Sequence, residues 1–232
     1  MKPWDIHAAC EFSGRRTTLT RLPSTSTSLV FALLPNGESQ LVVMGPRTRA
    51  SYFPHKDIPL TVNAQFHAGW AGMLTGVPVN ELTDRVIPLS DLWGADGTRL
   101  HDELTSDPRN ATDRMEKALA ARMSDNPAGL LVREATRWLD RERLPETARR
   151  LNISERHLRT LFTGAVGVSP KRYVQVNRVR SVLSRAGARK GAQLAAESGY
   201  YDQSHMTAEF RATMGVPLST YLKGDVPATS AC

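Results

Sequence analysis

A predicted helix over residues 154–166 has an apolar face and a cationic face. The apolar face carries Leu158, Leu161 and Phe162. The opposite face carries two arginines and two threonines, namely Arg156, Arg159, Thr160 and Thr163. Arginine can donate two parallel hydrogen bonds to guanine O6 and N7, and threonine makes short contacts to bases or phosphates. The pattern therefore predicts a helix that reads bases in the major groove of DNA, with a solvated surface face as the alternative.

A second predicted helix, 48 residues further along the chain, shows the same division. Met206 and Phe210 face inward, whereas Gln203, Ser204 and Thr207 face outward. The amide of Gln203 could make the paired hydrogen bonds that distinguish adenine. Because this face is less cationic than the first, we expect the two arginines of the first helix to supply more sequence discrimination.

The two helices belong to an internal repeat. The pattern F-x4-G-x5-Y that begins at residue 162 returns at residue 210. Upstream the offset is 47, since Ala148 and Asn152 correspond to Ala195 and Gly199, so the second copy has one extra residue in its turn. A small residue where helices cross, then Gly or Asn in the left-handed conformation, is what a helix-turn-helix requires. Each copy is predicted to be such a unit, with Ser154 capping the second helix of the first copy.

A single amphipathic helix over residues 170–186, about 26 Å long, is predicted to connect the two units. Lys171, at its start, is placed to contact a phosphate. Two recognition helices on such a spacer could enter successive major-groove segments about 34 Å apart, if the duplex bends or the helices tilt. One chain could then read both segments.

Residues 127–222 resemble the DNA-binding domain of AraC/XylS-type transcription regulators. In the first unit the matching residues are Ala148, Ser154, His157-Leu158, Phe162 and Gly167–Pro170. In the second unit they are Gly199–His205. The resemblance implies two helix-turn-helix units that together suffice, as a monomer, to bind bacterial promoters, usually as an activator and sometimes as a repressor. Two departures are the shortened Gly215-Val216-Pro217 and Ala208, which stands where many relatives have a long polar or basic side chain.

The predicted DNA-contacting residues form three groups. The first unit contributes Ser154, Arg156, His157, Arg159, Thr160 and Thr163. The start of the connecting helix contributes Lys171 and Arg172. The second unit contributes Gln203, Ser204, His205 and Thr207.

The distribution of charge agrees with a polyanionic partner. Residues 1–126 hold 13 Lys and Arg against 14 Asp and Glu, whereas residues 127–232 hold 17 against 9. The net charge of +7 therefore comes from the half that contains the repeat, where neutralising phosphates would release counterions. With 41 % apolar residues, no run long enough for a membrane span and no apolar leader, the sequence predicts a folded cytoplasmic protein.

The first half is predicted to be β-rich. Two apolar runs around Asn36-Gly37 predict a hairpin over residues 29–44, and residues 61–66 predict a further strand. Glycines at 69, 72 and 76 imply bends or close backbone approaches. A short helix is expected over 79–86, with Val79, Leu82 and Val86 on one face, and a capped turn over 90–93. Longer helices are expected over 98–105 and 108–123.

The predicted fold class is a two-domain α+β protein. A cupin-like barrel or small sheet with helical connectors occupies residues 1–123, and 124–126 form a linker that ends at Asn126-Pro127. An all-α domain with two helix-turn-helix units occupies 127–225, followed by a tail over 226–232. The first half also resembles, more faintly, the β-rich sensor domains that precede some AraC-type domains, through residues 34–38, 76–82 and 88–94.

The predicted function is transcription regulation through double-stranded promoter DNA. RNA polymerase is an expected partner, and the first half is expected to respond to a small-molecule effector or a partner protein. Met115 and Leu119 form a stripe for either internal packing or a dimer seam, so a monomer and a homodimer both stay open.

Two alternatives compete with this function. The first half could serve dimerisation alone, or the chain could fuse a metal-dependent cupin-type enzyme to the DNA-binding domain. The scattered histidines at 7, 55, 67 and 101 lack metal-ligand spacing, and no catalytic constellation is found. We therefore expect no enzyme activity, no metal and no cofactor.

Overall fold

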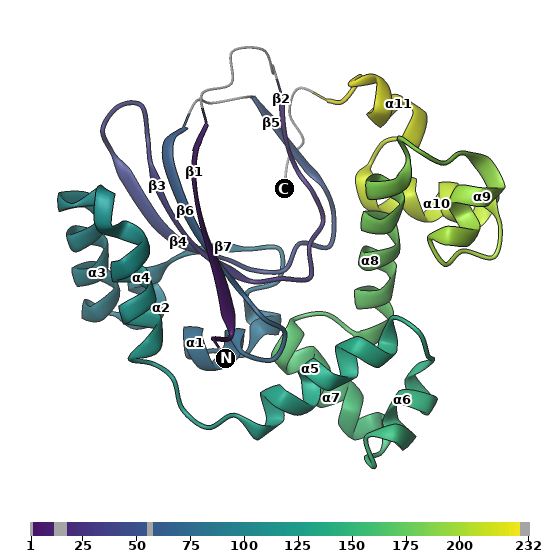
Figure 1. The fold of residues 1–232 in the computed structure, drawn as a ribbon, viewed down its shortest axis with the longest axis horizontal. Helices are drawn as coiled ribbons and strands as arrows, with labels where there is room; N and C mark the ends of the chain where they lie inside the picture. Colours follow the sequence, from purple (N-terminus) through teal and green to yellow (C-terminus); the bar gives the residue numbers. More distant parts are fainter. Residues whose placement is uncertain (1, 12–17, 55–57, 228–232) are drawn as a thin grey trace. The chain divides into compact units, whose positions relative to one another are not determined.

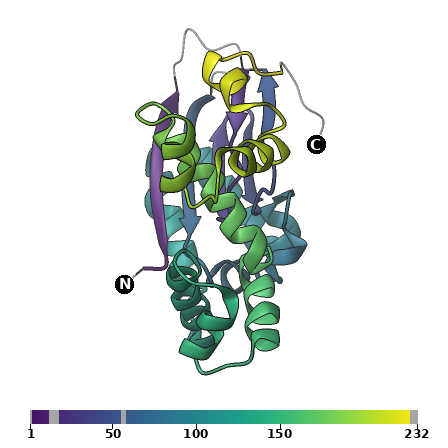
Figure 2. The same ribbon diagram turned by 90° about the vertical axis from the view of Figure 1, so that its right-hand side faces the viewer.

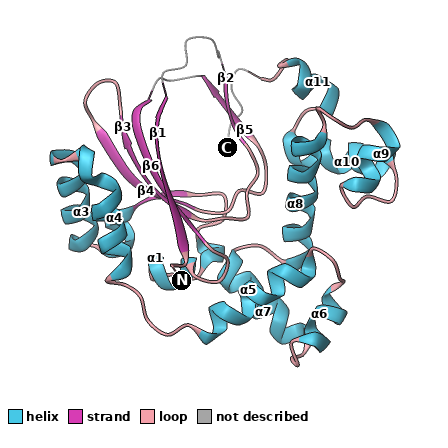
Figure 3. Ribbon diagram, in the orientation of Figure 1, coloured by secondary structure: helices cyan, strands magenta, loops and turns pink. Residues whose placement is uncertain are grey.

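The computed structural model describes residues 2–11, 18–54 and 58–227. His55 and the last part of the predicted tail, 228–232, lie outside the described residues. Within the described part, every strand lies before Leu89 and every later element is a helix (Figure 3). The predicted order of a β-rich region followed by a helical region is confirmed. No helix in the described ranges is long and apolar enough to cross a membrane.

The chain gathers into two compact units that do not follow the order of the sequence. The first unit holds the described residues within Met1–Gly14, Ser26–Pro46 and Asp57–Pro170. The second holds those within Arg15–Thr25, Arg47–Lys56 and Lys171–Cys232. Each unit therefore combines residues of the β-rich half with one helix-turn-helix. The two units show which residues pack together, and they do not show which segments fold independently. They therefore do not test the linker predicted at 124–126, which stays a prediction.

The first unit is built on an antiparallel sheet of five strands in the order β1-β6-β3-β4-β7. The strands are β1 (Trp4–Glu11), β3 (Ser28–Leu33), β4 (Ser39–Met44), β6 (Ile58–Phe66) and β7 (Val86–Pro88). The predicted hairpin is confirmed as β3 and β4, whose pairing ends at Leu33 and Ser39. Gly37 supplies the positive φ of the turn, at 84°. The strand predicted at 61–66 is confirmed within β6.

The helix predicted over residues 79–86 is wrong. Only a 3-10 turn, η1 (Val79–Glu81), forms there. Asp84 adopts a positive φ of 57°, which ends the helical path, and Val86 then pairs with Met44 as part of β7. Val79 and Leu82 are buried as expected, but Val86 is 51 % exposed.

Four helices accompany the sheet in the first unit: α1 (Ala71–Thr75), α2 (Leu89–Trp93), α3 (Ala95–Ser106) and α4 (Ala111–Ala120). A 3-10 turn, η2 (Pro108–Asn110), joins α3 to α4, so the long helix predicted from residue 108 has two parts. Helix α3 packs against β3 and β4, and α4 packs against β1 and β6 (Figure 1). Met115 and Leu119 of α4 are fully buried in this core. They serve internal packing, which settles the choice left open between packing and a dimer seam.

The break predicted near residue 126 begins helix α5 (Pro127–Leu139). The Asn126 side chain caps this helix by accepting from the Gly129 amide at 2.8 Å, and it donates to the Gly69 carbonyl at 3.0 Å. Gly69 has a φ of 89°, and a Cβ there would lie 2.3 Å from the Gly129 carbonyl oxygen. The close backbone approach expected at Gly69 is therefore confirmed.

Helices α6 (Leu144–Arg150) and α7 (Glu155–Val166) complete the first unit, and α7 packs against η1 and α1. The Thr83 hydroxyl donates to the carbonyl of Gly167, directly after α7, at 2.7 Å. A Cβ on Gly167 would lie 2.9 Å from the Val79 carbonyl oxygen. The first helix-turn-helix is thus fitted closely to residues of the β-rich half.

The second unit contains the remaining helices: α8 (Pro170–Arg185, after its first residue), α9 (Gly191–Glu197), α10 (Gln203–Met214) and α11 (Leu218–Lys223). Figure 2 shows α9 to α11, in yellow-green and yellow, gathered around the C-terminal end of α8. The connecting helix predicted over residues 170–186 is confirmed as α8.

A short ribbon from the β-rich half completes the core of the second unit. Strands β2 (Thr18–Arg21) and β5 (Ser51–Pro54) pair antiparallel. Tyr52 of β5 is buried against α8 and α10, and its hydroxyl donates to the Met214 carbonyl at 2.7 Å. The Ala50 amide donates to the Thr213 carbonyl at 2.9 Å. Burial raises the pKa of Tyr52 to about 12, which agrees with a phenol withdrawn from water.

Candidate nucleic-acid interface

The first helix-turn-helix is formed by α6, a tight turn and α7. Asn152 takes the left-handed conformation that the sequence predicted, with a φ of 54°. The Ile153 amide then donates to the Ala148 carbonyl at 3.1 Å. The Ser154 hydroxyl caps α7 by accepting from the His157 amide at 3.2 Å. These contacts fix the direction in which α7 leaves the turn.

Helix α7 divides into the two predicted faces. Leu158, Phe162 and Val166 are buried. The exposed residues are Ser154, Arg156, His157, Arg159 and Thr160, and Thr163 is half-buried. Within the described ranges, neither guanidinium of Arg156 and Arg159 has a hydrogen-bond or ion-pair partner in the protein. This face therefore presents two uncompensated positive charges.

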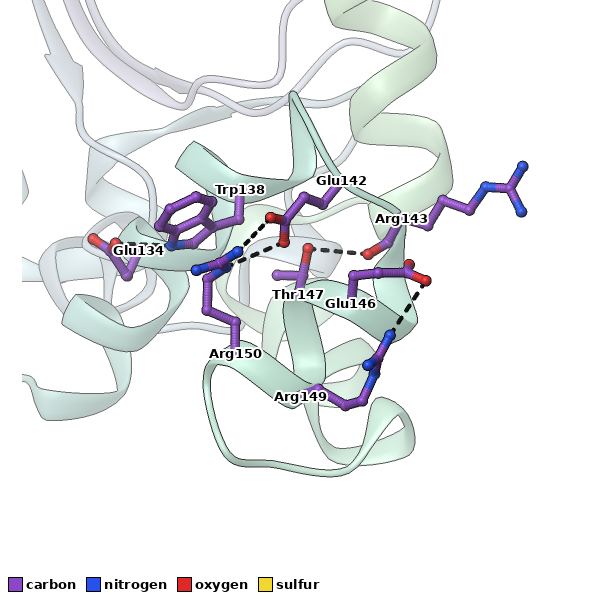
Figure 4. Close-up of polar contacts among 8 residues, drawn as sticks. All are labelled: Glu134, Trp138, Glu142, Arg143, Glu146, Thr147, Arg149 and Arg150. Atoms are coloured by element: carbon purple, nitrogen blue, oxygen red, sulfur yellow. Dashed lines mark hydrogen bonds and ion pairs between the residues drawn. The ribbon is translucent and has the colours of Figure 1, made fainter.

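Some arginines elsewhere in the same unit are paired with carboxylates, although the Arg143 guanidinium drawn beside them has no such partner among the described residues (Figure 4). Arg150 donates to Glu142 at 2.6 and 3.2 Å and lies 3.8 Å from the centre of the Trp138 ring. Arg149 pairs with Glu146 at 3.5 Å. The Arg150 hydrogen bonds lower the pKa of Glu142, which in turn raises the pKa of Arg150. Arg150 thus joins the end of α6 to Trp138 of α5 and to the segment between the two helices, whereas Arg149 pairs within α6.

The second helix-turn-helix repeats this frame with α9 and α10. Gly199 is left-handed, with a φ of 79°, and the Tyr200 amide donates to the Ala195 carbonyl at 2.9 Å. Asp202 caps α10 by accepting from the His205 amide at 2.7 Å. The cap at Asp202 was not predicted, although it stands 48 residues after Ser154 and could have been found from the repeat.

The outer face of α10 is polar rather than cationic. Met206, Phe210 and Met214 are buried, and the predicted contact residues Gln203, Ser204, His205 and Thr207 are all exposed. The Thr207 hydroxyl donates to the Gln203 carbonyl at 2.8 Å. His205 Nε2 lies 3.8 Å from Glu209 Oε2, so an acidic residue accompanies this face. Ala208 is exposed, as its place in the repeat implies.

The two units conserve one ion pair with its polarity reversed. Glu142 and Arg150 in the first unit correspond, at the offset of 47, to Arg189 and Glu197 in the second. Arg189 donates to Glu197 at 3.0 Å, and this hydrogen bond lowers the pKa of Glu197. Each pair therefore links the segment before the first helix of a unit to the end of that helix. The spacing of the pair was available in the sequence and was missed.

The two predicted contacts at the start of α8 differ in their surroundings. Lys171 is exposed and has no partner among the described residues. Arg172 is half-buried, and its guanidinium donates to the Thr48 carbonyl and, at 3.5 Å, to Gln175. A phosphate contact by Arg172 would compete with its hydrogen bond to residue 48.

The structure thus brings the predicted residues together in two sets, one around α7 in the first unit and one around α10 in the second. Lys171 and Arg172 belong to the second unit. Contact of any of these residues with DNA stays a prediction. Among the residues that the structure describes, no three His, Cys, Asp or Glu side chains are grouped so that they could hold a metal ion.

The comparisons with known proteins identify the class of the helical region. Residues 147–224 match the family model of a helix-turn-helix domain, of the AraC type. The predicted AraC-type domain is therefore confirmed over this range, and the chain is a DNA-binding transcription regulator. No curated protein sequence matches the chain.

Solved structures with similarity to the chain include proteins of two bacteria. The C-terminal domain of AraT, a response regulator from Geobacillus stearothermophilus, has a TM-score of 0.39 and 18 % identity over 46 % of this chain and 95 % of that one. Unsaturated fatty acid-bound wild-type ToxT from Vibrio cholerae has a TM-score of 0.43 and 15 % identity, covering 94 % of each chain. Another ToxT structure has a TM-score of 0.44 and 15 % identity, over 96 % of this chain and 98 % of that one.

Proposed function

We propose that the protein reads two successive major-groove segments of a promoter, with α7 as the stronger reader and α10 as the weaker one. The supporting observation is that two exposed arginines without a partner in the described part of the chain, Arg156 and Arg159, lie together on the outer face of α7. Arg137, Arg149 and Arg150 of the same unit are paired with carboxylates, whereas Arg109, Arg141 and Arg143 are not paired with any described carboxylate. Unpaired cations on the second helix of a helix-turn-helix suit phosphate attraction and guanine readout. The proposal assigns the chain no catalytic step, and RNA polymerase stays a proposed partner.

We further propose that the β-rich half modulates DNA binding, because its residues contact both helix-turn-helix units. In the first unit, Thr83 bonds to Gly167 at the end of α7. In the second unit, Tyr52 and Ala50 bond to Met214 and Thr213 at the end of α10. A shift of these β-rich residues would therefore change the orientation of a recognition helix within its own unit.

A groove beside α3 and α4 is the proposed place for a small-molecule effector. It encloses about 940 Å³. Its walls combine the apolar Met73, Trp93 and Leu100 with side chains of both charges, among them Lys117 and Asp113. Mixed walls of this kind suit a small ligand with an apolar body and a polar group. Thermal unfolding of the full chain with a panel of small amphipathic molecules tests this, since a ligand at a hundred times its Kd adds about 2.7 kcal/mol.

The experiment for the proposed function begins with selection of duplexes by the full chain from a random pool. The enriched duplex is then titrated by fluorescence anisotropy over a range of salt concentrations. With about six phosphate contacts, log affinity should fall with log salt at a slope of about −5. Failure to enrich any sequence, or a slope near zero for the enriched duplex, would contradict the proposal.

Arg156→Ala and Arg137→Ala form a matched pair for the same assay. Both arginines are exposed and belong to the same unit, but Arg137 is paired with Glu134 at 3.0 Å on α5. Arg156→Ala should cost about 1 to 3 kcal/mol on the selected duplex and less on random DNA. Arg137→Ala should keep the affinity of the parent. Equal losses for the two variants would remove the assignment of base reading to α7.

A further inference from the structure

The structure identifies the extra residue in the second helix-turn-helix. The amides of Ile153 and Tyr200 make the same hydrogen bond, to Ala148 and Ala195 respectively, so these residues correspond at an offset of 47. The helix caps Ser154 and Asp202 correspond at an offset of 48. The offset changes between Tyr200 and Asp202. Tyr201 is therefore the residue that the first unit lacks.

Tyr201 lies between two residues that are held in place, and its own side chain is almost fully exposed. Tyr200 is buried, its hydroxyl donates to Glu209 Oε1 at 2.9 Å, and Asp202 is held by its cap on α10. Between them, Tyr201 is 95 % exposed, the largest fraction for a large hydrophobic side chain in the described ranges. No hydrogen-bond partner for its phenol occurs among the described residues. The fold explains why Tyr200 and Asp202 are present, but it does not explain why residue 201 is a tyrosine.

The surroundings of Tyr201 suit an anionic ligand. The residue directly precedes α10, next to the exposed Gln203 and Ser204 at the start of that helix. The Arg178 guanidinium lies 5.7 Å from the centre of the Tyr200 ring, and its Nε is 3.5 Å from where a Cβ on Gly199 would stand. Arg178 therefore brings a positive charge to this turn, while the carboxylate of the neighbouring Asp202 is engaged as the cap of α10. Tyrosine hydroxyls are among the donors that contact DNA phosphates and set the position of the protein on the duplex.

We infer that Tyr201 is a phosphate-contacting residue that positions α10 on DNA, and this inference rests on the proposed function. The N-terminal residues of a recognition helix face the base edges. A side chain just before that helix then meets the sugar-phosphate backbone at the edge of the groove. The inserted tyrosine adds a neutral donor to a unit whose outer face lacks the two arginines of α7. It therefore positions the helix without reading sequence.

The test uses the full chain and the duplex that it enriches. Tyr201→Ala should lower affinity about fivefold, the value of one hydrogen bond. Tyr201→Phe keeps the ring and removes only the donor, so it should lose most of the same affinity. Each variant should lose the same factor in affinity on the enriched duplex as on a duplex with a scrambled second segment. The salt slope should not change, because neither substitution removes a charge. Leu222→Ala on α11, 55 % exposed, is the control and should bind like the parent.

The outcomes separate this inference from the proposed function. If the parent chain binds no duplex, the proposed function fails and the inference fails with it. If the parent binds and both Tyr201 variants match it, only the inference is overturned. A loss confined to the enriched duplex would indicate base reading and overturn the phosphate assignment. A lower thermal midpoint of the Tyr201 variants would overturn the inference in favour of a structural role. Lost transcription with unchanged DNA affinity would overturn it in favour of a protein-binding role.

Discussion

Helices α7 and α10 have the same frame and carry different outer faces. Both are 12 residues long, both are capped by an acceptor side chain three residues before the bonded amide, and both end at a left-handed glycine. Arg156 and Arg159 on α7 correspond to Ser204 and Thr207 on α10. The duplicated fold has therefore kept its backbone geometry while the charge on its reading surface has diverged. Backbone geometry specifies where a side chain points, and the side chain specifies what is read.

The two units also differ in how the β-rich half is joined to them. In the first unit the backbone of Gly167 lies tightly against Thr83, Pro46 and Val79. In the second unit it is a side chain inserted into a core, with Tyr52 buried against α8 and α10. A close backbone fit is sensitive to any added atom, whereas an inserted aromatic residue is sensitive to its removal.

Removal of the Tyr52 side chain should give the largest effect. Tyr52→Ala deletes a ring that is 2 % exposed, so the free energy of unfolding of the protein should fall by about 3 to 5 kcal/mol. Tyr52→Phe, which loses only the bond to Met214, should cost about 1 kcal/mol. Urea unfolding by circular dichroism measures the loss. The four tryptophans all lie in the first unit, so tryptophan fluorescence in the same titration shows whether that unit unfolds in the same transition.

Alanine substitution of the glycines that end α7 and α10 compares how closely each helix end is packed against its surroundings. Gly167 and Gly215 have φ values of 86° and 74°, so either substitution places a Cβ in the left-handed region, at about 1 to 2 kcal/mol. A Cβ at Gly215 meets nothing within 4 Å, whereas one at Gly167 also meets Thr83, Pro46 and Val79. Gly167→Ala should therefore destabilise the protein more than Gly215→Ala in urea titrations. Equal losses would show that α7 is not closely fitted to η1.

Alanine substitutions at equivalent positions on the outer faces of α7 and α10 test how much each helix contributes to sequence discrimination. Arg159→Ala should lose about 1 to 3 kcal/mol of discrimination between the enriched and a random duplex. Thr207→Ala should lose less, because its hydroxyl already donates to the Gln203 carbonyl. Anisotropy titrations of both variants on both duplexes give the comparison. A larger loss for Thr207→Ala would reverse the proposed ranking of α7 and α10.

The reversed ion pairs should give the smallest effect, visible in acid. Both Glu142 and Glu197 have a pKa below the ordinary value because arginine hydrogen bonds favour their charged form. The unfolded chain then takes up protons at a higher pH than the folded chain, so the free energy of unfolding falls as pH drops below about 4.5. Glu142→Gln should flatten this dependence. A double exchange, Glu142→Arg with Arg150→Glu, copies the polarity of the second unit and should restore it.

Features set by local chemistry were predicted from the sequence. The Asn36-Gly37 hairpin, the left-handed turns at Asn152 and Gly199, and the helix from residue 170 depend on neighbouring residues alone, and all are present. The internal repeat also predicted which residues of the second helix-turn-helix correspond to those of the first. Its change of offset showed that the second copy has one extra residue, and the backbone hydrogen bonds identify that residue as Tyr201.

Features set by distant partners were missed. Strand β1 forms because Trp4 pairs with Phe66, and β7 forms because Val86 pairs with Met44. Nothing near Tyr52 in the sequence indicates that its hydroxyl bonds to a carbonyl 162 residues away. The pairing of Arg172 with Thr48 is of the same kind. Periodicity describes a helix or strand on its own and carries no information on which segment will cover it.

Hydroxyl-radical footprinting of the full chain on its enriched duplex tests the central claim most directly. If α7 and α10 enter successive segments of the major groove, one bound chain should protect two windows of backbone about 10 base pairs apart. Arg156→Ala with Arg159→Ala should weaken the window assigned to α7 first. A single protected window, or two windows that need two chains by measured stoichiometry, would contradict reading by both helices of one chain.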